Sequence, residues 1–215
     1  GKMTRSLPVV LGRFIFDTAT DLALVPALEV IYGHGRHFEL FVGLFQLFTT
    51  VMYNLCQTFD VPLFLPEGEW HLLADLMTET YICLLFIHLS AIRSDSANII
   101  LRYVAFASCW LAKLRDRWST TVLEAVVLIC FACLPLMSTF APKTKRVPFV
   151  RQDLIRGLAA GGMAAFFFGM EQLVVTKWKI FLGMTHLSGG GSAYFLWRSV
   201  RVDVRKKSDV LPRFI

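Results

Sequence analysis

Long runs of apolar residues recur along the whole chain, and charged residues, proline or glycine separate them. A helix needs about 20 residues to cross a bilayer, and most of these runs reach that length. The connections between the runs are short. The pattern therefore predicts an all-α polytopic membrane protein, a bundle of seven transmembrane helices, at about residues 8–32, 37–57, 69–92, 97–113, 119–140, 152–175 and 179–199.

The composition agrees with this class, because 55% of the residues are hydrophobic and only 18% are charged. Soluble domains carry about 25% charged residues. No connection is long enough for a soluble domain, so we expect one membrane domain over residues 1–215 that ends in a short basic tail, residues 200–215. The five cysteines lie in or at the ends of apolar runs, where they are expected to pack as small hydrophobic residues.

The net charge of +6 arises largely from that tail. Seven crossings place more Lys and Arg residues on the side of the C-terminus than on the other side. The positive-inside rule then predicts a cytoplasmic or matrix-like C-terminus. We expect the basic tail to meet anionic lipid headgroups, and we expect no nucleic-acid partner.

The third apolar segment carries His71, Asp75 and Glu79 at intervals of four residues, so all three project from one face of a helix. A carboxyl group that faces lipid costs roughly 2.5–3.5 kcal/mol on insertion scales. This stripe is therefore expected to face protein or a wet cavity.

Two other segments carry intramembrane polar residues. Arg13, Asp17 and Asp21 follow one another at intervals of four in the first segment, where Arg13 and Asp17 can form an ion pair. Thr50 and Asn54 share a face of the second segment and are expected to form interhelical hydrogen bonds. A structural role is favoured for both sets over conduction or catalysis.

Glycines predict close helix packing near the end of the chain. Gly157 and Gly161 form a G-x-x-x-G pattern, which lets a neighbouring helix approach closely. The last segment contains three consecutive glycines, residues 189–191, which weaken a helix by roughly 1 kcal/mol each relative to alanine. Either a neighbouring helix packs very closely there, which is the favoured reading, or the backbone opens beside a cavity.

Several short stretches carry a resemblance to a known family. They are Leu22-Ala23-Leu24-Val25-Pro26 followed by Arg36–Val42, then Leu72-Leu73-Ala74-Asp75-Leu76, and Arg115-Asp116-Arg117-Trp118, with Phe166-Phe167-Phe168 and His186 in the region of the last two helices. Through them, residues 8–200 resemble the myomaker-like family of seven-helix membrane proteins. That family belongs to the CREST group, together with alkaline ceramidases and adiponectin-receptor-like proteins.

The resemblance implies a zinc site in catalytic members of the group. Their second helix supplies a histidine in a Ser-x-x-x-His pattern, and their seventh helix supplies a His-x-x-x-His pair. A nearby aspartate takes part through the metal-bound water. Three imidazoles and an open position let zinc lower the pKa of water to about 7 for attack on an amide or ester.

Mapped onto this chain, the pattern keeps Asp75 and His186 but departs elsewhere. The Ser-x-x-x-His positions read Thr50 and Asn54, and Gly190 replaces the second histidine of the seventh helix. Two of the three imidazoles are therefore missing, and we expect no zinc or other cofactor.

The first hypothesis is accordingly a non-catalytic member. It would be an integral membrane scaffold or an accessory subunit of a larger membrane protein complex, with membrane lipids and other membrane subunits as partners. A lipid-binding cavity near Asp75, Glu79 and His186 is compatible with this role. The small loops and the start at Gly1 suggest the mitochondrial inner membrane, with the plasma membrane or an endomembrane as the alternative.

The second hypothesis is a zinc-dependent lipid amidase or esterase with an altered ligand set. Asp75 would position the water and His186 would bind the metal, with His71 or Glu79 completing the site. A third class is proton or ion transport along the two acidic stripes.

Overall fold

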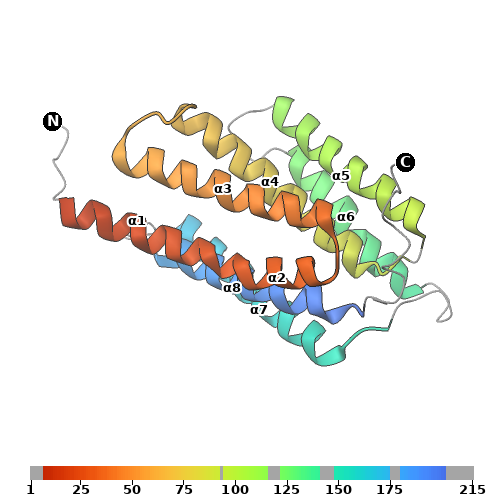
Figure 1. The fold of residues 1–215 in the computed structure, drawn as a ribbon. Coiled ribbons are helices and arrows are strands. Elements are labelled where there is room, and N and C mark those ends of the chain that lie inside the picture. Colours follow the sequence, from red (N-terminus) through yellow and green to blue (C-terminus); the bar gives the residue numbers. More distant parts are fainter. Residues whose placement is uncertain (1–6, 93, 116–121, 141–147, 175–179, 202–215) are drawn as a thin grey trace, which may run out of the picture.

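The computed structural model describes residues 7–92, 94–115, 122–140, 148–174 and 180–201. Its helices lie side by side (Figure 1). In chain order they are α1 (Leu7–Asp21), the 3-10 turn η1 (Leu22–Leu24), α2 (Val25–Gly33), α3 (His37–Phe59), α4 (Glu67–Leu89), α5 (Asp95–Arg115), α6 (Val122–Phe140), α7 (Arg151–Leu173) and α8 (Ile180–Ser199).

Each predicted apolar segment coincides with a helical stretch of the structure, with ends that differ by a few residues. The first segment is divided into α1, η1 and α2, and Pro26 lies in the first turn of α2, where its missing N–H costs no hydrogen bond. Within the described residues the only β-type pairings are two isolated bridges, Leu63 with Leu65 and Phe149 with Val200. The all-α prediction is confirmed.

Four helices, α3, α4, α5 and α7, are long and apolar enough to cross a membrane. Helix α6 carries a shorter apolar stretch, Val122–Ser138. The chain is thus a helical multi-pass membrane protein. Large apolar side chains also cover much of its outer surface, as a surface in contact with lipid requires; examples are Ile100, Leu111, Ile129, Leu158 and Phe166.

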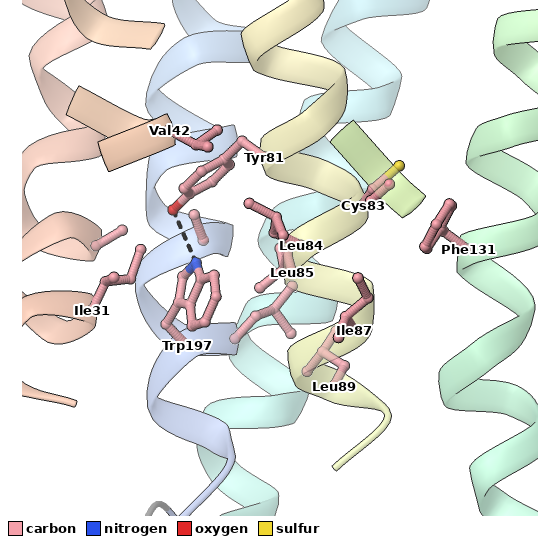
Figure 2. Packing of buried hydrophobic residues seen from close by; sticks show 14 of the residues in the cluster. Ile31, Val42, Tyr81, Cys83, Leu84, Leu85, Ile87, Leu89, Phe131 and Trp197 are labelled. Carbon is pink, nitrogen blue, oxygen red and sulfur yellow. Dashed lines mark hydrogen bonds between the residues drawn. The ribbon is translucent and has the colours of Figure 1, made fainter. Parts of the chain in front are cut away.

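Helix α4 forms the centre of the bundle, because it packs against α3, α5, α6 and α8. The side chain of Trp197, from α8, is fully buried against it. Figure 2 shows the Trp197 indole Nε1 donating a hydrogen bond to the Tyr81 hydroxyl, at 2.9 Å. Two turns further along α4, His88 Nε2 lies 3.0 Å from the carbonyl oxygen of Trp197. These buried polar contacts fix how α8 is rotated against α4.

Replacing Tyr81 with Phe removes the acceptor of the buried indole N–H. We expect a loss of about 1–3 kcal/mol in stability, which is the usual cost of leaving a buried donor unsatisfied. Unfolding of the detergent-solubilised protein measures the change. Tyr103→Phe is the matched control, because the Tyr103 ring is largely exposed on α5; an equal loss in both variants would contradict the assignment.

The predicted close approach at the G-x-x-x-G pattern is confirmed between α7 and α8. A Cβ atom on Gly157 would lie 2.6 Å from Leu196 Cγ, and one on Gly161 would lie 3.0 Å from Ser192 Oγ. The Ser192 hydroxyl donates a hydrogen bond to the carbonyl oxygen of Gly157, at 2.8 Å. Among the described elements, α7 packs on α8 alone, so these small residues anchor a peripheral helix.

The three consecutive glycines lie inside a continuous helix α8, so the backbone does not open there. A Cβ atom on Gly190 would collide with the backbone carbonyl of Ala23, in η1. Gly189 and Gly191 have open space where a Cβ atom would be. The close-packing prediction is therefore confirmed at Gly190, the middle glycine of the three.

Candidate functional site

Two groups of polar side chains lie in the half of the bundle where α3 ends and α4 begins. The first, which we call the Asp21 cluster, joins α1, α3 and α8. Asn54 Nδ2 donates a hydrogen bond to Asp21 Oδ2 at 2.7 Å, and His186 Nδ1 lies 2.7 Å from Asp21 Oδ1. The Asp21 side chain is only 6% exposed, whereas the His186 side chain is 32% exposed. Both carboxylate oxygens of Asp21 are thus engaged by neighbouring helices.

Small residues on α8 make this cluster possible. Gly190 lets α8 approach the backbone of η1, which directly follows Asp21 in the chain. A Cβ atom on Gly183 would lie 2.6 Å from the ring of Phe16 on α1. His186 lies between these two glycines in sequence, so the close approach of α1 and α8 brings its ring to Asp21.

A further set of contacts ties α1 to α3 on the N-terminal side of Asp21. Arg13 Nε lies 3.5 Å from Asp17 Oδ2, which confirms the predicted ion pair. An Arg13 guanidinium nitrogen also donates to Gln57 Oε1 at 3.4 Å, and Gln57 Nε2 donates to the Tyr53 hydroxyl at 2.5 Å. The acidic stripe of the first segment is therefore bonded to a neighbouring helix.

The second group, which we call the Lys113 cluster, joins α4, α5 and α6. Lys113 Nζ lies 3.0 Å from Glu124 Oε1, 3.2 Å from Glu79 Oε1 and 3.5 Å from Asp75 Oδ2. His71 Nδ1 lies 3.2 Å from the same oxygen of Asp75. Asp75 and Glu79 thus share a buried cation that belongs to a different helix.

Burial changes steadily across the Lys113 cluster. Glu124 is fully buried, Lys113 is 6% exposed and Glu79 is 15% exposed, whereas Asp75 and His71 are each 40% exposed. Three carboxyl groups surround one ammonium group, so negative charge exceeds positive charge when all are ionised. Because such a charge is costly next to lipid, the half-exposed end at Asp75 and His71 must face water or another protein.

The two clusters adjoin each other. Tyr53, which directly precedes Asn54 in α3, accepts a hydrogen bond from Gln57 at its hydroxyl, and its ring packs edge-on against His71 with the ring centroids 4.9 Å apart. Polar side chains from α1, α3, α4, α5, α6 and α8 therefore form one layer in this half of the bundle, which we call the polar layer.

The structure distributes the predicted site residues differently from the sequence analysis. Asp75 and His186, which were expected at one site, belong to different clusters, and Asp21 is the carboxylate that meets His186. Asn54 forms the expected interhelical hydrogen bond, but the Thr50 hydroxyl donates to Gln46 within its own helix, so the expectation for Thr50 was wrong.

Of the Arg115-Asp116-Arg117-Trp118 motif, only Arg115 belongs to the described residues, and most of the basic tail also lies outside them.

Several buried charged residues, among them Lys113 and Glu39, were not singled out from the sequence. Lys113 is the cation that neutralises the Asp75 stripe, and no motif in the sequence analysis included it. Glu39 is almost fully buried at the opposite end of the bundle, where Arg36 and Arg102 each approach its Oε1 atom to 3.0 Å. The sequence did carry a signal for such ion pairs, because residues of opposite charge lie at similar depths in the membrane on different predicted helices.

The residues that would correspond to zinc ligands converge around the carboxylate of Asp21. Asn54 and His186 both engage Asp21, and Gly190 packs on the backbone of Ala23. The set offers one imidazole and one carboxylate, whereas catalytic zinc sites use three protein ligands. Within the described ranges, no group of three His, Cys, Asp or Glu side chains is arranged to hold a metal ion.

A family model described as "Protein of unknown function (DUF3522)" matches residues 10–187. This range contains every residue of the Asp21 cluster and of the Lys113 cluster. No curated protein matches the chain.

Proposed function

We propose that this chain, which belongs to the DUF3522 family of proteins of unknown function, is a non-catalytic membrane scaffold. It would act as an integral accessory subunit of a larger membrane protein complex, with other membrane subunits and lipids as its partners. In this proposal all seven apolar segments cross the membrane and the C-terminus lies on the cytoplasmic or matrix-like side. The architecture follows the resemblance to the myomaker-like family, without that group's zinc chemistry.

The observation that carries the proposal is the arrangement around Asp21. At the positions where the resemblance implies zinc ligands, Asn54 and His186 instead hold a buried carboxylate from a third helix. The hydrogen bond from Asn54 links two helices, and such bonds within a membrane are worth about 0.6 kcal/mol each on average. The His186 ring lies against the same carboxylate. The polar groups are thereby engaged in joining α1, α3 and α8, which is what a scaffold requires.

The outer surface supports a role in assembly. Helix α7 contacts α8 alone among the described elements, and most of its apolar side chains are exposed. Lipids or helices of other subunits would cover this surface in the membrane. A lipid headgroup would meet the polar layer at its half-exposed side chains, which are His71, Asp75 and His186.

The test combines native electrophoresis with elemental analysis of protein extracted from its own membranes in mild detergent. We expect a particle larger than the chain alone, and zinc well below one atom per chain. His186→Ala should leave the zinc content unchanged, as should the control His37→Ala at the exposed start of α3. Stoichiometric zinc that is lost in His186→Ala only, or a particle of the size of a single chain, would contradict the scaffold role.

One observation favours the second candidate, a metal-dependent lipid amidase or esterase. A carboxylate that accepts a hydrogen bond from one ring nitrogen of a histidine fixes the ring and raises the basicity of the other nitrogen. Asp21 is placed to do this for His186. The same zinc measurement decides between the two candidates.

A further inference from the structure

The loop between α3 and α4 displays a fully exposed aromatic ring. Phe64 is 98% exposed, more than any other large apolar residue in the described part of the chain, and Val61 is about half exposed. The loop lies at the same end of the bundle as the beginning of α1 (Figure 1). A solvated phenylalanine at the end of a helical hairpin has no stabilising role within the chain itself.

The chain holds this loop in a strained shape. Asp60 and Phe64 have φ angles of 55° and 60°, in the left-handed region that non-glycine residues rarely adopt. Such positions cost about 1–3 kcal/mol each and persist only where the surroundings enforce them. The enforcing contact is visible, because the buried side chain of Trp70 donates a hydrogen bond from Nε1 to the carbonyl oxygen of Leu63 at 2.8 Å.

Two prolines restrict the loop further. Pro62 and Pro66 have fixed φ angles, and the N–H of Leu65 bonds to the carbonyl oxygen of Leu63 at 2.6 Å. A loop restricted in this way loses little conformational entropy when another molecule covers it, which favours binding. The restricted loop therefore keeps the Phe64 side chain exposed to the outside.

Acidic residues flank Phe64 on both sides in the sequence. Asp60 and Glu67 are exposed on the two sides of the loop, and Glu69 is partly exposed in the first turn of α4. Residues 58–70 include His, Lys and Arg at no position. The surface is an apolar centre with a negative rim, which we call the Phe64 knob.

We propose that the Phe64 knob is the docking surface for another membrane protein subunit. The fitting partner offers an apolar socket rimmed by Lys or Arg side chains. An aromatic anchor within a charged rim is the usual arrangement of a binding hot spot. This inference rests on the proposed accessory function and adds to it the contact surface and the chemistry of the partner.

Insertion of Phe64 into the bilayer agrees less well with the acidic residues beside it than docking to a protein does. The carboxylates of Asp60 and Glu67 flank the ring closely in sequence and would be carried toward the lipid headgroups with it. Membranes that contain anionic lipids repel such a negative rim. A basic-rimmed protein socket would cover the ring and place positive charge next to the acidic residues.

The test measures the accessibility of a thiol at this position. Phe64→Cys is labelled with a water-soluble maleimide in native membranes, and in vesicles of phosphatidylcholine and phosphatidylglycerol that contain only the purified chain. The wild type is the blank, because Cys56, Cys83 and Cys109 are buried and the other two cysteines lie on the apolar helix α6. We expect rapid labelling in the vesicles and labelling slower by about tenfold in native membranes, which corresponds to 1.4 kcal/mol.

Charge and position controls make the outcome specific. Adding Glu67→Lys, or raising the salt concentration, should restore labelling in native membranes, because either change weakens the contact between the acidic rim and a basic partner. Arg115→Cys, on the exposed end of α5, should be labelled equally in both preparations. Protection of the introduced thiol in the vesicles would mean burial in the bilayer and would overturn the proposal, as would equal labelling in both membranes.

Native electrophoresis of Phe64→Ala separates this inference from the proposed function. Loss of the large particle, with the helical fold retained, supports the Phe64 knob as the docking surface. If the particle persists in this variant, the accessory role survives and the knob proposal fails. If the wild type forms no such particle, both fail.

Discussion

Replacing Lys113 with Met should destabilise the protein by about 3–5 kcal/mol, the usual cost of removing one partner from a buried ion pair. The ammonium group lies within 3.5 Å of oxygens from three carboxyl groups, and its side chain is almost fully buried. Its loss would leave Glu79 and Glu124 next to each other without a counter-charge. The measurement is the unfolding free energy of the protein in detergent, with unfolding monitored by circular dichroism.

Two further variants test the cause of this loss. Arg115→Met removes a positive charge two residues away on the exposed end of α5, and a surface change of this kind is expected to stay within about 0.5 kcal/mol. Adding Glu79→Gln and Glu124→Gln to Lys113→Met should recover much of the lost stability, because it removes the unpaired charges. A stable Lys113→Met variant would mean that the three carboxyl groups do not depend on the ammonium group.

The positions of the helices could be predicted from the sequence because the membrane allows few alternatives. A backbone in lipid must satisfy its own hydrogen bonds, so an apolar run of sufficient length forms a helix. The ends of α3 and α4 consequently lie within two or three residues of the predicted boundaries. The division of the first segment at Asp21 was not predicted, since its polar residues resemble those of a continuous helix.

The side-chain partners could be predicted only where both residues lie on one helix. Arg13 and Asp17 are four residues apart, so helix geometry alone brings them together. The contact between Asp21 and His186 instead depends on which helices are neighbours and how each is rotated. Short loops and apolar faces do not determine either one. For this reason Asp75 and His186 were expected near one site, whereas Asp75 lies beside Lys113 and His71 and His186 lies beside Asp21.

The polar groups also indicate how the bundle is held together at its two ends. Glu39, with its two arginines, joins α3 to α5 near the loop that follows α2. In the opposite half, where α4 begins, the Asp21 cluster joins α1, α3 and α8, and the Lys113 cluster joins α4, α5 and α6. Helix α4 itself is held in the middle of the bundle by apolar packing and by the hydrogen bond between Tyr81 and Trp197. The interior charges thus act as links between helices, which agrees with the proposed structural role.

Replacing Gly190 with Ala should destabilise the protein by about 1–3 kcal/mol or more, the typical cost of inserting a methyl group into a well-packed interior. The new Cβ atom would collide with the backbone of Ala23, which cannot move aside as a flexible side chain can. Gly189→Ala is a closely matched control, because a Cβ atom there meets open space and alanine favours a helix by about 1 kcal/mol. The neighbouring variants should therefore change the unfolding free energy in opposite directions. Similar effects of both would show that the close approach of α8 to η1, which also brings His186 to Asp21, does not constrain this bundle.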